Sequence, residues 1–188
     1  MHSKLSVKCL FAIRSADAYF ALAAPTTNRI AVGDLNNWPS ILEDSAASAT
    51  LLSLSLELYL KCLMLKLGFK LKRIHELDGL FSMLPLEAQE RVNAHYERHQ
   101  TPLSQTQNVE YRIAIPNENE NEHAEPFWPS EDETTDIKSV LSRCKNAFVT
   151  WRYLYQKIDD TDGYSIHRYE FHRMISACKS LRDHILES

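Results

Sequence analysis

A charged pair on an otherwise apolar stretch is the first place in this sequence where chemistry could occur. Glu57 and Lys61 lie four residues apart in the leucine-rich segment 51–67, so a helix would place both on one face. A buried charge is costly unless it is paired. The pair is therefore either a structural ion pair that fixes helix register or part of a ligand-facing surface. For the second case we expect the binding residues to be Glu57, Lys61, His75, Arg152 and Tyr155.

Two other patterns resemble metal sites, but in each of them a required ligand is not at the position that the site needs. His95 and His99 are one helical turn apart, but a zinc protease needs its glutamate directly after the first histidine, and Glu97 is two positions on. We interpret both histidines as surface residues. In the acidic turn 159–163, a calcium loop would place Ile158 at the first position, where an oxygen ligand is required. The sequence therefore predicts no metal and no cofactor.

The four cysteines are far apart and form no CxxC pair, which favours free, buried thiols in a reducing compartment. The apolar run after Lys8 is interrupted by Arg14 and Asp17, so we expect no signal peptide. The apolar segment 51–67 contains charged residues, so we expect no membrane span. These features predict a cytoplasmic protein. The cysteines are Cys9, Cys62, Cys144 and Cys178.

The length of 188 residues suits a single domain, residues 1–188, and the four glycines are too few for a sheet protein or a glycine-rich phosphate loop. Apolar periodicity and turn residues predict long helices with short joints. The sequence therefore predicts an all-α antiparallel bundle of about five to six helices. The expected helices are about 5–24, ending before Pro25, then 39–67 with Gly68 as its stop, 75–81, 86–99, 137–158, and a last helix from about 168 onward.

Residues 103–133 differ from the rest of the chain. They hold eight acidic side chains and one arginine, a net charge of −7 in a chain of net charge −4, which leaves about +3 elsewhere. They are also rich in proline and lack periodicity. We predict that this segment is an acidic, mobile loop, dispensable for folding. A weakly basic body permits a nucleic-acid surface without requiring one.

Three short strings carry a family resemblance. LELYLKCL at 56–63, HELDGLF at 75–81 and FVTWRY at 148–153 resemble HEPN-domain proteins of prokaryotes. The resemblance covers mainly residues 45–85 and 137–185. It implies a helical bundle that is often a homodimer. Many members are metal-independent RNases of toxin–antitoxin, CRISPR or phage-defence systems, and others are noncatalytic modules that bind nucleotides or partners.

The RNase members of that family carry an arginine, four to six intervening residues and a histidine. Here the nearest pairs are Arg91–His95 and Arg168–His172, each with three residues between. We therefore predict a noncatalytic or regulatory module that binds a nucleotide, RNA or a protein partner. One alternative is an RNase that uses Arg168 and His172, one turn apart on the last helix, across a homodimer. The other is a purely structural adaptor.

Overall fold

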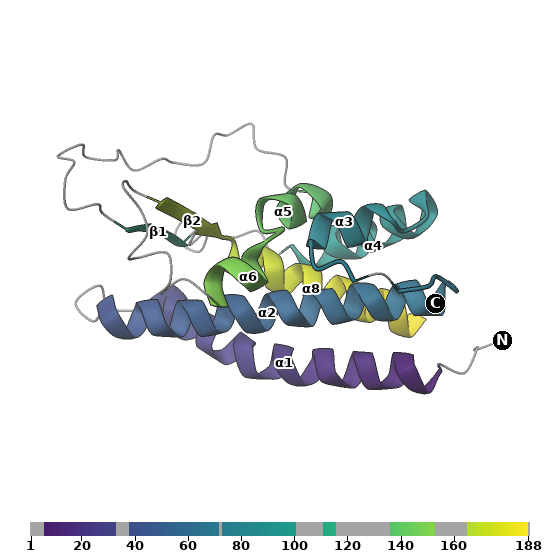
Figure 1. Cartoon of the computed structure of the whole chain (residues 1–188), viewed down its shortest axis with the longest axis horizontal. Coiled ribbons are helices and arrows are strands. Elements are labelled where there is room, and N and C mark those ends of the chain that lie inside the picture. The colour runs from purple at the N-terminus through teal and green to yellow at the C-terminus, as the bar shows by residue number, and fades with distance from the viewer. Residues whose placement is uncertain are drawn as a thin grey trace.

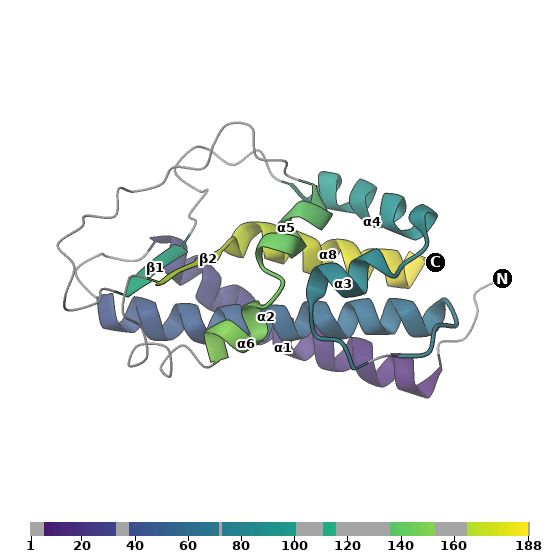
Figure 2. The ribbon, with the colours of Figure 1, turned by 45° about the horizontal axis from the view of Figure 1, so that its top comes forward.

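The computed structural model describes residues 6–32, 38–71, 73–100, 111–115, 136–152 and 165–187. Two long helices, α1 (Val7–Val32) and α2 (Trp38–Lys66), run antiparallel and pack along one another (Figure 1). The C-terminal helix α8 (Phe171–Glu187) lies against α2, and α4 (Leu86–His99) lies against α8 (Figure 2). The predicted all-α helical bundle is confirmed.

The core forms where these helices meet, and α2 supplies its centre. Leu52, Leu56, Leu60 and Leu63 on α2 are fully buried. Each buried leucine removes enough apolar surface from water to contribute about 1.5–3 kcal/mol. Helix α8 contributes a second buried stripe with helical spacing: Phe171, Met174, Cys178, Leu181 and Ile185.

Of two helix ends predicted from the sequence, one is confirmed and one is wrong. Helix α2 ends as expected: Gly68 has φ +82°, and its N–H and that of Phe69 donate to Leu65 O and Met64 O, as in a Schellman motif. The predicted end of the first helix before Pro25 is wrong, because α1 continues through Pro25 to Val32. Proline removes one backbone donor, and packing along α2 offsets that loss.

The single helix predicted over 137–158 is also wrong. The chain forms α5 (Ile137–Arg143) and α6 (Ala147–Arg152), joined by a tight turn, and residues 153–158 lie outside the described residues. The turn frees the carbonyl of Lys145 to accept the N–H of Leu77, the first residue of α3 (Leu77–Ser82), at 3.3 Å. That N–H would otherwise lack a partner, as first-turn donors do. Trp151 remains buried and Phe148 is half-buried.

A two-stranded antiparallel ribbon joins the acidic segment to the residues before α8. Strand β1 (Tyr111–Ile115) pairs with β2 (Ser165–Tyr169), with Tyr111 opposite Tyr169 and Ile115 opposite Ser165. The segment 103–133 therefore contains a strand and is not entirely loop. Its flanks, 103–110 and 116–133, are outside the described residues. Figure 2 shows the ribbon at the opposite end of α8 from α4.

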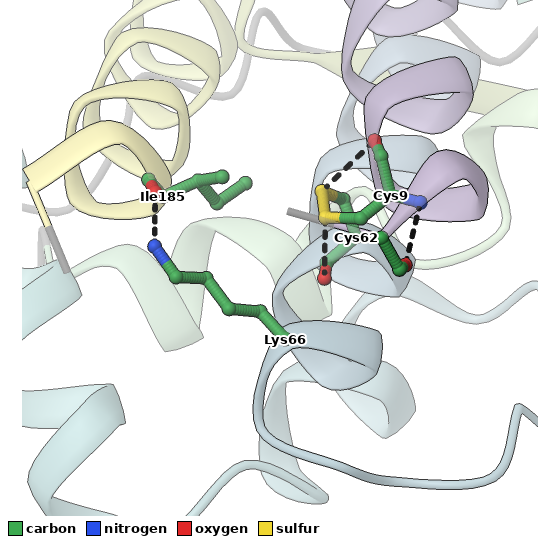
Figure 3. The surroundings of a disulfide bond; sticks show 5 residues. Cys9, Cys62, Lys66 and Ile185 are labelled. Atoms are coloured by element: carbon green, nitrogen blue, oxygen red, sulfur yellow. Dashed lines mark hydrogen bonds between the residues drawn. A yellow bond between two sulfur atoms is a disulfide. The ribbon is translucent and has the colours of Figure 1, made fainter. Parts of the chain in front are cut away.

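The prediction of four free thiols is wrong for two of them. Cys9 on α1 and Cys62 on α2 form a disulfide bond, with their Cα atoms 4.9 Å apart (Figure 3), whereas Cys144 and Cys178 are free and buried. The two residues are 53 positions apart, so only the packing of α1 on α2 brings them together. Disulfide bonds are more usual in oxidising compartments. The expected cytoplasmic location stays a prediction.

One described helix segment is long and apolar enough to cross a membrane by length and composition alone. It is Ser45–Lys66, with a mean hydropathy of 1.4 over its most apolar window. Within the bundle 67% of that window is buried, as in the core helix of a soluble protein.

Candidate functional site

The predicted polar pair on α2 is a closed network. The Glu57 side chain is only 6% exposed, and its Oε1 accepts from Lys61 Nζ at 2.6 Å. His75 Nδ1, from the segment between α2 and α3, lies 3.0 Å from Oε1 and 3.1 Å from Oε2. Both carboxylate oxygens therefore have partners from this chain. That arrangement matches a structural ion pair better than a ligand-facing surface.

The other two predicted binding residues do not complete this group. Arg152 is exposed on α6, where its guanidinium lies 5.6 Å from the centre of the Phe148 ring. Among the described side chains, the contacts of Glu57 run to Lys61 and His75 and not to Arg152. Tyr155 lies outside the described residues.

The two histidines of α4 are not the plain surface residues that the sequence predicts. The side chain of His95 is only 9% exposed, and its ring centre lies 5.7 Å from that of His184 on α8. His99 is half-buried, and its Nε2 lies 2.7 Å from Asp183 Oδ2, also on α8. The prediction of surface histidines is therefore wrong, because α4 packs antiparallel to α8 and turns this face inward.

A small pocket of about 250 Å³ lies where α4 meets the last turns of α8, and we call it the α4–α8 pocket. Two arginines and two imidazoles line it, against a single carboxylate. Three of its residues on α4, Arg91, Ala94 and Arg98, are exposed. The lining residues are Arg91, Ala94, His95, Arg98, His184 and Glu187.

The hydrogen bonds of His95 assign its tautomer. Arg98 Nη2 lies 2.7 Å from His95 Nδ1. A guanidinium can only donate, so Nδ1 accepts and carries no hydrogen. The ring hydrogen is then on Nε2, which lies 3.3 Å from Glu187 Oε2. His95 thus presents an oriented N–H donor toward the pocket, backed by an arginine.

The second imidazole is kept neutral by its surroundings. Burial lowers the pKa of His184, and the nearby His95, Arg91 and Lys66 lower it further, while Glu187 opposes them. Protonation of His184 would place another positive charge beside these groups. At neutral pH the fixed positive charges of the pocket are therefore those of Arg98 and of Arg91, whose Nη2 also pairs with Glu87 Oε1 at 2.6 Å.

A second hollow of about 550 Å³ lies between α1 and α8, and its charged groups largely satisfy one another. Asp17 Oδ1 accepts from Tyr59 Oη at 2.5 Å and from Arg182 Nε at 2.8 Å. Burial, and next the Asp17 carboxylate, raise the pKa of Tyr59, so this hydroxyl remains a donor. The acidic groups of this hollow, Asp17 and Asp183, are therefore engaged by neighbouring side chains.

The residues of the alternative RNase site are not arranged as predicted. Arg168 lies on strand β2, whereas His172 lies in the first turn of α8, so the pair does not share a helix. Among described residues, Nε2 of His172 is buried without a hydrogen-bond partner, and burial lowers the pKa of this histidine. No group of three or more metal-ligating side chains occurs in the described part of the chain.

The sequence pattern could have indicated the α4 side of the α4–α8 pocket, but not its α8 side. Arg91, His95 and Arg98 are spaced by four and three residues, which places them on one helix face. Their partners on α8 are almost ninety positions away, and no local pattern connects them. Comparisons with protein-family models, curated proteins and solved structures find no match to this chain.

Proposed function

We propose that this protein is a noncatalytic binding module whose ligand carries a phosphate group, such as a nucleotide or an RNA. The observation that carries the proposal is the gathering of Arg91, Arg98 and two buried imidazoles around one pocket. Guanidinium groups match the geometry of phosphate oxygens and donate several hydrogen bonds at once. The resemblance to noncatalytic HEPN modules is a further support.

The donors of the pocket are held before any ligand arrives. Arg98 fixes the His95 ring, and both imidazoles are at least nine-tenths buried as residues. Preorganised donors bind an anion with little loss of side-chain entropy. Arg91 and Arg98 line the pocket and are also exposed, so their guanidinium groups are accessible to a phosphate that is attached to a larger molecule.

The lining of this pocket favours binding over catalysis. It contains no hydroxyl, thiol or amine nucleophile, and His95 has no free ring nitrogen to act as a general base, because Arg98 donates to Nδ1 and the ring hydrogen is on Nε2. The alternative RNase with Arg168 and His172 has less support, because the two residues are on different elements and Nε2 of His172 is buried. The third hypothesis, a purely structural adaptor, has support only from the closed ion-pair network around Glu57. We retain the homodimer and a prokaryotic defence or toxin–antitoxin context as predictions.

The proposal is tested by calorimetric titration with inorganic phosphate, a nucleoside monophosphate and a short single-stranded RNA at constant ionic strength. We expect saturable binding that Arg98→Gln weakens at least tenfold, roughly the effect of losing one charge-assisted contact. Arg73→Gln removes the same charge from an exposed site between α2 and α3 and is the matched control. With EDTA present, the RNA should remain intact.

Two results would contradict the proposal. One is the absence of saturable binding for all three ligands. The other is equal weakening by Arg98→Gln and Arg73→Gln, which would mean that the effect is one of total charge and not of this pocket.

A further inference from the structure

Glu187 is an unusual residue for its place in the fold. It lies in the last turn of α8, where the negative end of the helix dipole disfavours an acidic side chain. Near that end, the carbonyl of Ile185 accepts a hydrogen bond from Lys66 Nζ at 2.7 Å (Figure 3). This is the favourable arrangement, because a cation stabilises the C-terminal end of a helix. A glutamate at this position is therefore slightly unfavourable, and nearby positive groups would offset that effect.

The α4–α8 pocket supplies such groups. Glu187 Oε2 lies 3.3 Å from Nε2 of His95, the nitrogen that carries the ring hydrogen. Arg98 adds positive charge on the α4 side, as does Arg91, whose guanidinium also pairs with Glu87 at 2.6 Å. The carboxylate thus occupies the place and makes the contact that an incoming anion would take.

The contact is easily broken from the Glu187 side. Its side chain is 63% exposed, whereas that of His95 is only 9% exposed. A mostly exposed ion pair contributes little stability, so the glutamate can rotate into water while His95 remains fixed by Arg98.

We propose that Glu187 is a built-in competitor for the α4–α8 pocket, an intramolecular carboxylate that a phosphate-bearing ligand must displace. This inference rests on the proposed function of the same pocket. Displacement returns the carboxylate to water and transfers the Nε2–H donor of His95 to the ligand. Glu187 therefore lowers the affinity of the pocket and restricts it to anions that bind better than a carboxylate does.

The test compares phosphate binding by the full chain, by Glu187→Gln and by Glu90→Gln. Glu90 is an exposed glutamate of α4 outside the pocket lining, so its variant controls for net charge. We expect Glu187→Gln to bind inorganic phosphate roughly threefold to tenfold more tightly, the factor expected for loss of a partly exposed ion pair. Glu90→Gln should match the unmodified chain. Glu187→Ala, which removes the whole carboxylate, should change the affinity in the same direction.

A second readout follows the carboxylate itself. In ¹³C spectra, the side-chain carboxyl signal of Glu187 should move toward that of a solvent-exposed glutamate as phosphate saturates the protein. Binding by Glu187→Gln but not by the unmodified chain would also support the competitor, because the site would then be masked. Unchanged or weaker binding by Glu187→Gln, while the unmodified chain binds, overturns this inference and leaves the proposed function standing. If no form binds phosphate, both fail.

Discussion

Glu57 is held inside the bundle by partners from two parts of the chain. Lys61 comes from the same helix, and His75 comes from the segment that follows α2. The His75 side chain is 58% exposed and Lys61 is 15% exposed, so water reaches the outer side of this network. The group is therefore a link between α2 and the segment leading to α3, built around one buried carboxylate.

Replacement of Glu57 by alanine should destabilise the fold without affecting ligand binding. Breaking a fully buried pair costs about 3–5 kcal/mol, and because Lys61 can extend its ammonium to water we expect about 2 kcal/mol here. Urea denaturation measures the change, with Glu90→Ala as the exposed control. If Lys61→Ala instead lost phosphate affinity at unchanged stability, the binding site would lie at this network and not at the α4–α8 pocket.

His172 should make stability depend on pH. Its pKa in the folded protein lies below its ordinary value of 6.5, because burial disfavours the charged ring. The unfolded chain then binds more protons in the interval just below pH 6.5. The free energy of unfolding should therefore be at its full value above that pH and decrease as the pH falls through it.

The measurement is the urea midpoint at several pH values from 7.5 to 5 in the unmodified chain and in His172→Gln. We expect a smaller decrease in the variant, since glutamine does not titrate. Because burial also lowers the pKa of His184, the difference between the two proteins is the decisive quantity. If the urea midpoints of the two proteins change with pH in parallel, His172 does not have a lowered pKa in the folded protein.

At the scale of helices, α1 and α2 are tied together by covalent chemistry as well as by packing. Cys9 and Cys62 are both buried, and the Sγ atom of each also lies 3.4 Å from the backbone carbonyl of the other. The bond closes a loop that includes the connection between the two longest helices. It therefore restricts the unfolded chain more than the folded one.

Reduction of this disulfide should lower the free energy of unfolding by roughly 4 kcal/mol, the value expected from chain entropy for a loop of this length. Denaturation with and without a reductant measures it, and Cys9→Ser/Cys62→Ser should reproduce the reduced protein. Cys144→Ser is the control, because that cysteine is buried and is not part of the disulfide. Equal midpoints under both conditions would show that the bond does not form in solution.

The whole molecule presents an apolar row on its outermost helix. Val7 is 82% exposed, Phe11 75% and Leu22 65%, and all three belong to α1. Large exposed apolar side chains gathered on one element are typical of interaction sites. A two-fold axis would pair such a face with its own copy, and the homodimer stays a prediction.

We therefore expect a dimer that buries the outer face of α1. Light scattering coupled to gel filtration should give twice the chain mass for the unmodified protein and a monomer for Phe11→Ser. Leu86→Ser, at a residue of α4 that is 69% exposed, should remain dimeric. If the unmodified protein has the mass of a monomer even at high concentration, the predicted dimer is wrong.

Several elements of the fold follow from the sequence alone. Helix α4 spans Leu86–His99 as the apolar spacing predicts, and Gly68 ends α2 because a left-handed residue needs no Cβ. The central place of α2 follows from its nearly continuous leucines. Local patterns suffice in these cases because the forces act within a few residues of one another.

The remaining features depend on residues distant in sequence. The break between α5 and α6 accompanies a hydrogen bond from Leu77, and strand β1 exists through its pairing with β2. The Glu57 pair could be predicted from spacing, but its closure by His75 could not. The α4–α8 pocket, likewise, exists only because α4 lies antiparallel to α8 and brings His95 to His184 and Glu187. The sequence determined which helix faces were polar or apolar, and tertiary packing decided which of those faces meet.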